Sequence, residues 1–180
     1  MLSKNLLIFM KNIIFDRDGI INDVVMRNGS PSSPWKKDEF SFKTDIFGLV
    51  KKLHLNKYKI FVASNQPDIS RGNLQEKDLN YFNDLISSKL KIPNRNIYIC
   101  KHDNHHNCQC RKPKPGMLNK ILNDFNLNLD ETCFIGDSHK DLEAASSINM
   151  KFIYLKTPYN SYPKNQVEII HSLKDLQINI

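Results

Sequence analysis

The fold is decided by the stretch Met10-Lys-Asn-Ile-Ile-Phe-Asp-Arg-Asp-Gly-Ile-Ile-Asn22. Its centre, Asn12 to Phe15, is a short run of β-branched and aromatic residues, which is typical of a buried strand. The run stops at Asp16, Arg17 and Asp18, so charged side chains stand where the strand ends. We therefore interpret this stretch as the first strand of a sheet whose carboxyl end carries chemistry.

The rest of the chain alternates hydrophobic runs with helical patterns. The runs predict further strands over 59–63, 96–100, 132–135 and 151–155. Apolar spacing predicts helices over 46–55, over 75–90, from 115 or 116 to 125, and after Asp137, while 167–173 is expected to pack back. This order predicts an α/β fold with a Rossmann-like parallel sheet flanked by helices. We expect one domain over residues 1–180, with 1–9 as a peripheral tail.

Composition and charge narrow the classes of function. Hydrophobic residues make up 40% of the chain, and no apolar run approaches the roughly 20 residues that a membrane helix needs. The apolar core at 6–10 is too short for a signal peptide, which predicts a cytoplasmic protein. The net charge of +7 favours anionic partners, but no basic stripe interleaved with aromatic residues accompanies it. We therefore expect neither a nucleic acid nor a membrane as partner, and we expect a monomer.

Polar residues follow the predicted strands, and in a parallel sheet such positions meet at one edge. After the strands stand Asp16, Arg17, Asp18, Ser64, Asn65, Gln66, Gly136 and Asp137, and Arg111 and Lys112 follow the loop at 100–110. A phosphate monoester resists attack by an anion until cations offset its charge, so carboxylates, a hydroxyl and cations together suit phosphoryl transfer. Mg²⁺ prefers oxygen ligands, which Asp16, Asp137 and the backbone carbonyl of Asp18 offer.

The segment Asp16-Arg-Asp-Gly-Ile-Ile-Asn resembles the first motif of the haloacid dehalogenase superfamily. Ser64-Asn-Gln is similar to its second motif, Lys112 to its third and Gly136-Asp-Ser to its fourth. The resemblance implies that Asp16 attacks phosphorus, that Asp18 moves the proton, and that Ser64 and Lys112 hold the phosphoryl oxygens. It also implies Mg²⁺ at Asp16, Asp18 and Asp137. The candidates for substrate contact are Asn65, Gln66, Arg111 and Arg27, together with Arg71.

A second cluster has the composition of a structural zinc site. Cys100-Lys-His102 is followed by Cys108-Gln-Cys110, which gives three thiolates and one imidazole for a closed tetrahedron. His105 and His106 are alternative ligands, and Cys133 is expected to be a buried hydrophobic residue. Because Arg111 and Lys112 follow at once, Zn²⁺ in the loop 100–110 would fix where these two cations point.

The run Cys110-Arg-Lys-Pro-Lys-Pro-Gly-Met, with the Cys/His loop, resembles the subgroup that contains D-glycero-D-manno-heptose 1,7-bisphosphate phosphatase and the histidinol-phosphate phosphatases. The resemblance implies hydrolysis of a small sugar phosphate, most specifically the 7-phosphate of the heptose bisphosphate. Histidinol-phosphate hydrolysis is the alternative. A polynucleotide phosphatase and a zinc-containing nucleic-acid-binding protein rank below both.

The stretch 22–43 is predicted to be a long loop without a regular period, and loops of that length are usually functional. Superfamily members often carry a cap domain after the first strand or after the helix that follows the second motif. Neither interval is long enough for one here, so we expect no cap domain. The site should be open, with only this loop and the zinc loop beside it.

Overall fold

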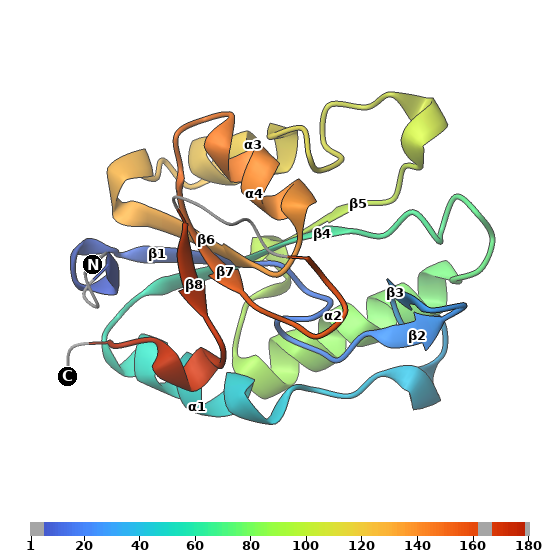
Figure 1. The fold of residues 1–180 in the computed structure, drawn as a ribbon, viewed down its shortest axis with the longest axis horizontal. Helices are drawn as coiled ribbons and strands as arrows, with labels where there is room; N and C mark the ends of the chain where they lie inside the picture. Colours follow the sequence, from blue (N-terminus) through green and yellow to red (C-terminus); the bar gives the residue numbers. More distant parts are fainter. Residues whose placement is uncertain (1–5, 162–166, 179–180) are drawn as a thin grey trace.

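The computed structural model describes residues 6–161 and 167–178, whose centre is a six-stranded parallel sheet (Figure 1). The strands follow the order β5-β4-β1-β6-β7-β8. They are β1 (Asn12–Phe15), β4 (Lys59–Asn65), β5 (Ile97–Cys100), β6 (Thr132–Gly136), β7 (Lys151–Leu155) and β8 (Glu168–Ile170). The α/β fold with a parallel sheet is therefore confirmed. The strand β1, which Asp16 follows directly, lies inside the sheet between β4 and β6.

Helices cover both faces of the sheet. They are α1 (Thr44–Leu55), α2 (Glu76–Leu90), α3 (Gly116–Asp124) and α4 (His139–Ser146). Figure 1 shows α1 and α2 below the sheet and α3 and α4 above it. The alternation of side chains along a strand builds the two cores, because Ile13 and Phe15 of β1 join the α1/α2 side and Ile14 joins the α3/α4 side. All three side chains are fully buried.

The boundaries follow from local chemistry. The apolar residues of α1, Ile46, Leu49, Val50 and Leu53, recur at helical spacing and are buried. The five predicted strands are all present, although β5 begins one residue later than predicted, after the 3₁₀ turn η3 (Asn94–Asn96). The structure adds β8 within 167–173, a stretch that was expected only to pack back. A further 3₁₀ turn, η5 (Leu129–Glu131), precedes β6, and η6 (Leu173–Asp175) follows β8.

The stretch 22–43 is not the irregular loop that the sequence predicted. It contains a two-stranded hairpin, β2 (Val25–Arg27) and β3 (Ser30–Ser32), followed by the 3₁₀ turn η2 (Lys37–Glu39). Both turn residues, Asn28 and Gly29, have positive φ angles of 50° and 76°. A two-residue hairpin turn of this type favours Asn-Gly, so the signal was present but the strands are too short to show an alternating pattern. Among the described residues, neither interval considered for a cap domain holds one.

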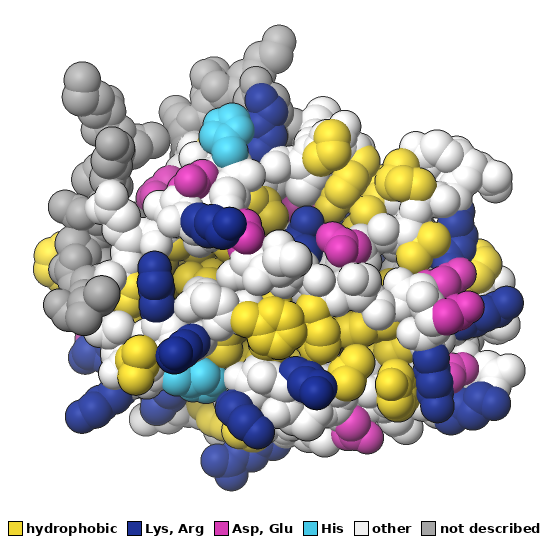
Figure 2. Space-filling model, turned by 90° about the horizontal axis from the view of Figure 1, so that it is seen from below, with side chains coloured by type: hydrophobic (Ala, Val, Ile, Leu, Met, Phe, Trp, Pro, Cys, Tyr) yellow, Lys and Arg dark blue, Asp and Glu magenta, His cyan; other side chains and the backbone are white. Residues whose placement is uncertain are grey.

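The expected peripheral tail is anchored to the core. The 3₁₀ turn η1 (Leu6–Phe9) places Leu7 in the α1/α2 core, and the Tyr58 hydroxyl donates to the backbone oxygen of Leu7 at 2.7 Å. Residues 1–5 of that tail lie outside the described residues. In the described part of the chain, no helix combines the length and apolar character needed to cross a bilayer. Figure 2 shows lysine and arginine side chains scattered over the α1/α2 face rather than gathered in one stripe.

Candidate active site and metal centre

Strand register places the first aspartate of the motif at the centre of the sheet edge. Phe15 lies level with Val62 and Ile135, and the backbone N–H of Asp16 donates to the oxygen of Ile135 at 2.9 Å. Gly19 then turns the chain at a φ of +89°, where a Cβ would lie 2.1 Å from Asp137 Oδ2. The glycine of the first motif is therefore required, because only its backbone fits against the Asp137 carboxylate.

Lys112 reaches this edge from the loop before α3. Its ammonium donates to Asp16 Oδ1 and to the backbone oxygen of Ala63, each at 2.8 Å, and pairs with Asp141 Oδ1 at 2.6 Å. The Asn65 amide binds the backbone of Lys112 in both directions, at 3.0 and 2.9 Å. Burial alone would lower the pKa of Lys112, but the Asp141 and Asp16 carboxylates outweigh it and raise the pKa. The lysine thus stays charged inside the protein.

Three buried carboxylates gather around this lysine. Ligand oxygens of Asp16, Asp137 and Asp141 lie within 4.8 Å of one another. Burial, reinforced by Asp141, raises the pKa of Asp16 well above its ordinary value, and the same two causes raise the pKa of Asp137 to about 7. One ammonium does not balance three crowded carboxylates, so the cluster has the charge and the oxygen donors that fit a divalent cation.

Asp141 is the residue of this group that the sequence analysis missed. Besides pairing with Lys112, it accepts hydrogen bonds through Oδ2 from the backbone N–H of Ser138, at 3.1 Å, and from its hydroxyl, at 2.6 Å. Ser138 in turn caps the backbone of Asp141, which completes a capping box at the start of α4. The signal was Ser138 with an acid three residues later, directly after the fourth motif. Because its oxygens are engaged in this way, Asp141 serves mainly to hold Lys112.

Asp18 lies beside the three carboxylates, and its own carboxylate accepts hydrogen bonds from four other side chains. Its carboxylate accepts from Arg17 Nη2 at 3.0 Å, Asn22 Nδ2 at 2.9 Å, Gln66 Nε2 at 2.6 Å and Ser33 Oγ at 3.0 Å. Burial alone would raise the pKa of Asp18, but Arg17 and the hydrogen bonds from Asn22 and Gln66 lower it. Asp18 is therefore ionised in this state, and its side chain is directed to protein donors.

The second motif, Ser64-Asn65-Gln66, contributes one residue to the lining of the cavity and two buried residues beside it. The Ser64 hydroxyl is buried and accepts a hydrogen bond from Gln66 Nε2 at 2.9 Å, so Gln66 connects Ser64 to Asp18. Of the three residues of this motif, only Asn65 lines the cavity in front of the cluster. The structure therefore places Gln66 beside Asp18 and Ser64 next to Gln66.

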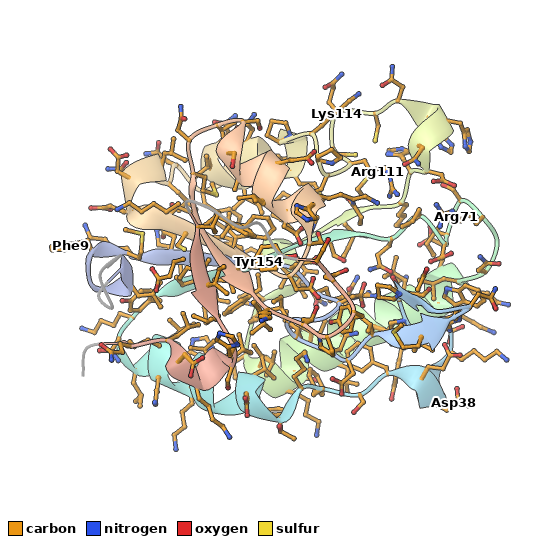
Figure 3. The ribbon with its side chains drawn as sticks, in the orientation of Figure 1. Phe9, Asp38, Arg71, Arg111, Lys114 and Tyr154 are labelled. Carbon is orange, nitrogen blue, oxygen red and sulfur yellow. The ribbon has the colours of Figure 1, made fainter. Side chains whose placement is uncertain are left out.

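The cavity has a volume of about 440 Å³ and lies between the hairpin, the turn after β4, the loop before α3 and the start of α4. Its lining includes Asp16, Asp18, Ser33, Lys112, Asp137 and Asp141, which have little or no exposure, and the more exposed Pro31, Ser32, Arg71, Arg111 and Lys140. Figure 3 shows Arg71 and Arg111 coming from two separate loops at the same end of the sheet. The cavity thus has an acidic floor and a basic rim.

Arg27, like Gln66, is a predicted substrate contact that does not line the cavity. Its guanidinium donates to the backbone oxygen of Ser33 at 2.8 Å, pairs with Glu39 and stacks 3.8 Å from the centre of the Trp35 ring. It is not among the residues that line the cavity. Arg27 instead ties the hairpin to η2 and so fixes the position of Ser33, which contacts Asp18.

The four predicted zinc ligands converge. The three sulfurs of Cys100, Cys108 and Cys110 lie 3.2–3.7 Å apart, and His102 Nδ1 lies 3.3 Å from Cys110 Sγ. A Zn–S length of about 2.3 Å would put two sulfurs of a tetrahedron roughly 3.8 Å apart, so these spacings fit one ion. Burial raises the pKa of Cys100 to about 12, which a bound cation would reverse. Cys133 is buried in the α1/α2 core, apart from this cluster, as predicted.

The loop 100–110, which carries the predicted zinc ligands, contacts both walls of the cavity. Gly116, the first residue of α3, packs so closely on it that a Cβ would lie 2.2 Å from the backbone oxygen of Gln109. Asp103, next to His102, accepts two hydrogen bonds of 2.7 Å from Arg71, and Arg111 donates to the backbone oxygen of His102 at 3.2 Å. A 3₁₀ turn, η4 (Asn104–His106), completes the loop. Its geometry therefore sets both rim arginines.

An acidic cluster around a buried lysine, at the carboxyl edge of this sheet, defines the class of the protein as a phosphatase of the haloacid dehalogenase type. The model of the polynucleotide kinase 3 phosphatase family matches residues 11–162. The chain therefore belongs to that family.

Several curated relatives share one activity. D-glycero-β-D-manno-heptose-1,7-bisphosphate 7-phosphatase of Helicobacter pylori (strain J99) is 32% identical over 175 residues, which cover 91% of this chain and 97% of that protein. The D-glycero-α-D-manno-heptose-1,7-bisphosphate 7-phosphatase of Campylobacter jejuni is 31% identical over 177 residues, which cover 93% and 98%. A crystal structure of D,D-heptose 1,7-bisphosphate phosphatase from B. bronchiseptica with magnesium and phosphate has a TM-score of 0.77 at 25% identity, covering 92% and 95%.

Proposed function

We propose that this chain hydrolyses the 7-phosphate of a D-glycero-D-manno-heptose 1,7-bisphosphate. The observation that carries the proposal is the convergence of Asp16, Lys112 and Asp137 on one cavity in a chain that resembles heptose bisphosphate phosphatases over nearly its whole length. Arg71 and Lys140, which line the cavity, are exposed to solvent. Openness suits hydrolysis, because the second step of the reaction requires water.

Asp16 is the proposed nucleophile. Its carboxylate forms a bond to phosphorus while the bond between phosphorus and the sugar oxygen breaks, which gives an aspartyl phosphate and an alcohol. Water then attacks the phosphorus of this intermediate, releasing inorganic phosphate and the Asp16 carboxylate. Lys112, only 2.8 Å from Asp16 Oδ1, stays charged throughout and offsets the negative charge that collects there.

Asp18 is the proposed proton carrier. It must hold a proton to protonate the departing sugar oxygen and must be ionised to take a proton from the attacking water. The hydrogen bonds that Gln66 and Ser33 donate to Asp18 suit its ionised form, and the pKa of Asp18 is lowered accordingly. A phosphate dianion nearby would raise the pKa of Asp18, so we expect proton uptake when substrate binds.

Two metals complete the proposal. Mg²⁺ would be held by Asp16, Asp137 and the backbone carbonyl of Asp18, and when bound it offsets charge on the phosphoryl group. Zn²⁺ would be held by Cys100, His102, Cys108 and Cys110 as a closed structural site. Because Arg111 and Lys112 follow Cys110 directly in the sequence, a Zn²⁺ ion at this site would fix the positions of both residues.

The basic rim favours a substrate with a second anionic group. Arg71, Arg111 and Lys140 all line the cavity, and burial together with these two arginines lowers the pKa of Lys140. Cations that repel one another in this way are stabilised when an anion binds between them. A bisphosphate would place one phosphate at Asp16 and the other toward this rim. Histidinol phosphate has no second phosphate to use these cations.

Phosphate release from a substrate panel with Mg²⁺ tests the proposal. The panel holds both anomers of the heptose bisphosphate, histidinol phosphate and an oligonucleotide with a 3′-phosphate. We expect one heptose anomer to have the highest kcat/KM, and we expect Asp16→Asn to abolish release while keeping the fold. A preference for histidinol phosphate or for the oligonucleotide would overturn the substrate, and activity of Asp16→Asn would overturn the nucleophile.

A further inference from the structure

The segment after β7 returns across the carboxyl edge of the sheet and makes two contacts with Asp137. The Tyr159 hydroxyl donates to Asp137 Oδ2 at 2.9 Å, and Asn160 Nδ2 donates to the backbone oxygen of Asp137 at 2.8 Å. The Tyr154 hydroxyl, which lies near the middle of the molecule in Figure 3, anchors the same segment by donating to the backbone oxygen of Ser161 at 3.0 Å.

The hydroxyl of Tyr159 lies in a crowded position. A Cβ on Gly19 would be 2.8 Å from Tyr159 Oη and 2.1 Å from Asp137 Oδ2, so backbone, phenol and carboxylate meet at one point. Asp137 is buried, at 3% exposure, and its carboxylate packs directly against this turn. Among the described residues, Tyr159 supplies the side-chain hydrogen bond that the Asp137 carboxylate accepts. The Tyr159 hydroxyl therefore holds Oδ2 of Asp137 in place and makes no hydrogen bond to Oδ1.

We propose that Tyr159 is a positioning residue for the divalent cation, because it fixes the orientation of the Asp137 carboxylate. The inference rests on the proposed cation at Asp16 and Asp137. Crowded carboxylates repel one another and would turn apart without a cation, which would cost energy when the cation later binds. A hydrogen bond that holds one of them in place removes part of that cost. Outer partners of metal ligands typically change metal affinity 10–100-fold when they are removed.

The test is the binding of Mg²⁺ alone, measured by calorimetry on the full chain without substrate. Tyr159→Phe removes the hydroxyl and keeps the ring, so we expect the Kd for Mg²⁺ to rise on the order of tenfold. We expect kcat on the heptose bisphosphate to recover at saturating Mg²⁺, because Tyr159 does not contact the reacting atoms. Tyr98→Phe is the matched control, since its hydroxyl also binds a carboxylate, that of Asp124, away from the cavity. Its Kd should equal that of the unmodified chain.

An unchanged Kd in folded Tyr159→Phe would overturn the inference, as would a loss of kcat that added Mg²⁺ does not restore. Circular dichroism at the titration temperature verifies the fold of each variant. If Tyr159→Phe does not fold, Tyr159→His is titrated instead; because the shorter imidazole does not reach the position of the phenol oxygen, a weaker Kd supports the role and a Kd that matches the unmodified chain contradicts it. If the unmodified chain itself binds no Mg²⁺, the proposed cation site fails, which is distinct from failure of the Tyr159 role alone.

Discussion

Replacing Asp137 by Asn should stabilise the magnesium-free protein at alkaline pH. Asp137 is 3% exposed and lies in the carboxylate cluster, and burial together with Asp141 raises its pKa from 3.8 to about 7. Because the pKa of Asp137 is raised in the folded state, folding favours its protonated form. The contribution of Asp137 to the free energy of unfolding is therefore complete below the unfolded-state pKa near 4 and is lost as the pH rises through 7. At about pH 8 the folded protein therefore carries an ionised group that folding disfavours, and the amide removes that charge.

The magnitude follows from the pKa. The difference between 3.8 and about 7 corresponds to on the order of 4 kcal/mol, at about 1.4 kcal/mol for each pKa unit. Part of this energy is repulsion between Asp137 and the neighbouring carboxylates of Asp16 and Asp141, which can adjust when one member of the cluster is neutral. We therefore expect the single substitution to raise the free energy of unfolding by about 2 kcal/mol. For a chain of 180 residues this corresponds to a rise in Tm of roughly 4–8 °C.

The assay is thermal unfolding in magnesium-free buffer without a chelator, so that the zinc proposed for the loop 100–110 is not removed. The difference between Asp137→Asn and the unmodified chain should be present at about pH 8 and small at about pH 4, where both side chains are uncharged. Added Mg²⁺ should reverse the order, because it stabilises only a protein that binds it. Asp38→Asn, at an exposed carboxylate, is the control. A variant less stable than the unmodified chain at alkaline pH without Mg²⁺ would refute the reasoning.

Two other substitutions test the remaining parts of the site. Cys108→Ser should remove one ligand of a closed tetrahedral site, so that metal analysis finds zinc lost and the melting temperature lowered; full zinc content would contradict the ligand set. Lys112→Met leaves the carboxylates of Asp16 and Asp141 buried without their ammonium and should lower the free energy of unfolding by about 3–5 kcal/mol, measured in denaturant. Unchanged stability of Lys112→Met would show that the two carboxylates are neutral in the fold.

The parts of the site that could be predicted from sequence are those that follow strands. Asp16, Ser64 and Asp137 each stand directly at or after a β-rich run, and parallel strands bring such ends together. Asp141 and Tyr159 could not be found in this way, because one lies inside a helix and the other in a segment without a period. Arg27 shows the opposite failure, since a cation in a functional loop was assigned to substrate although Glu39 and Trp35 bind it.

The fold shows the same division. Buried strands and the apolar faces of α1 and α2 could be predicted because burial imposes a period on the sequence. The hairpin of three-residue strands could not, because its stability comes from contacts such as that of Arg27 with Ser33 rather than from a hydrophobic face. Distances between the four zinc-type ligands were also beyond the sequence, although their spacing along the chain already indicated one centre.

The pairing of β1 with β4 and β6 constrains how this protein can change over evolutionary time. Asp16 is level with its neighbours because Phe15 pairs with Val62 on one side and Ile135 on the other. Deleting one residue from either neighbouring strand would shift its end by about 3.3 Å and turn every side chain to the opposite face. Viable insertions and deletions are therefore confined to the connections, so descendants can acquire new substrates through their loops while the reacting groups keep their positions.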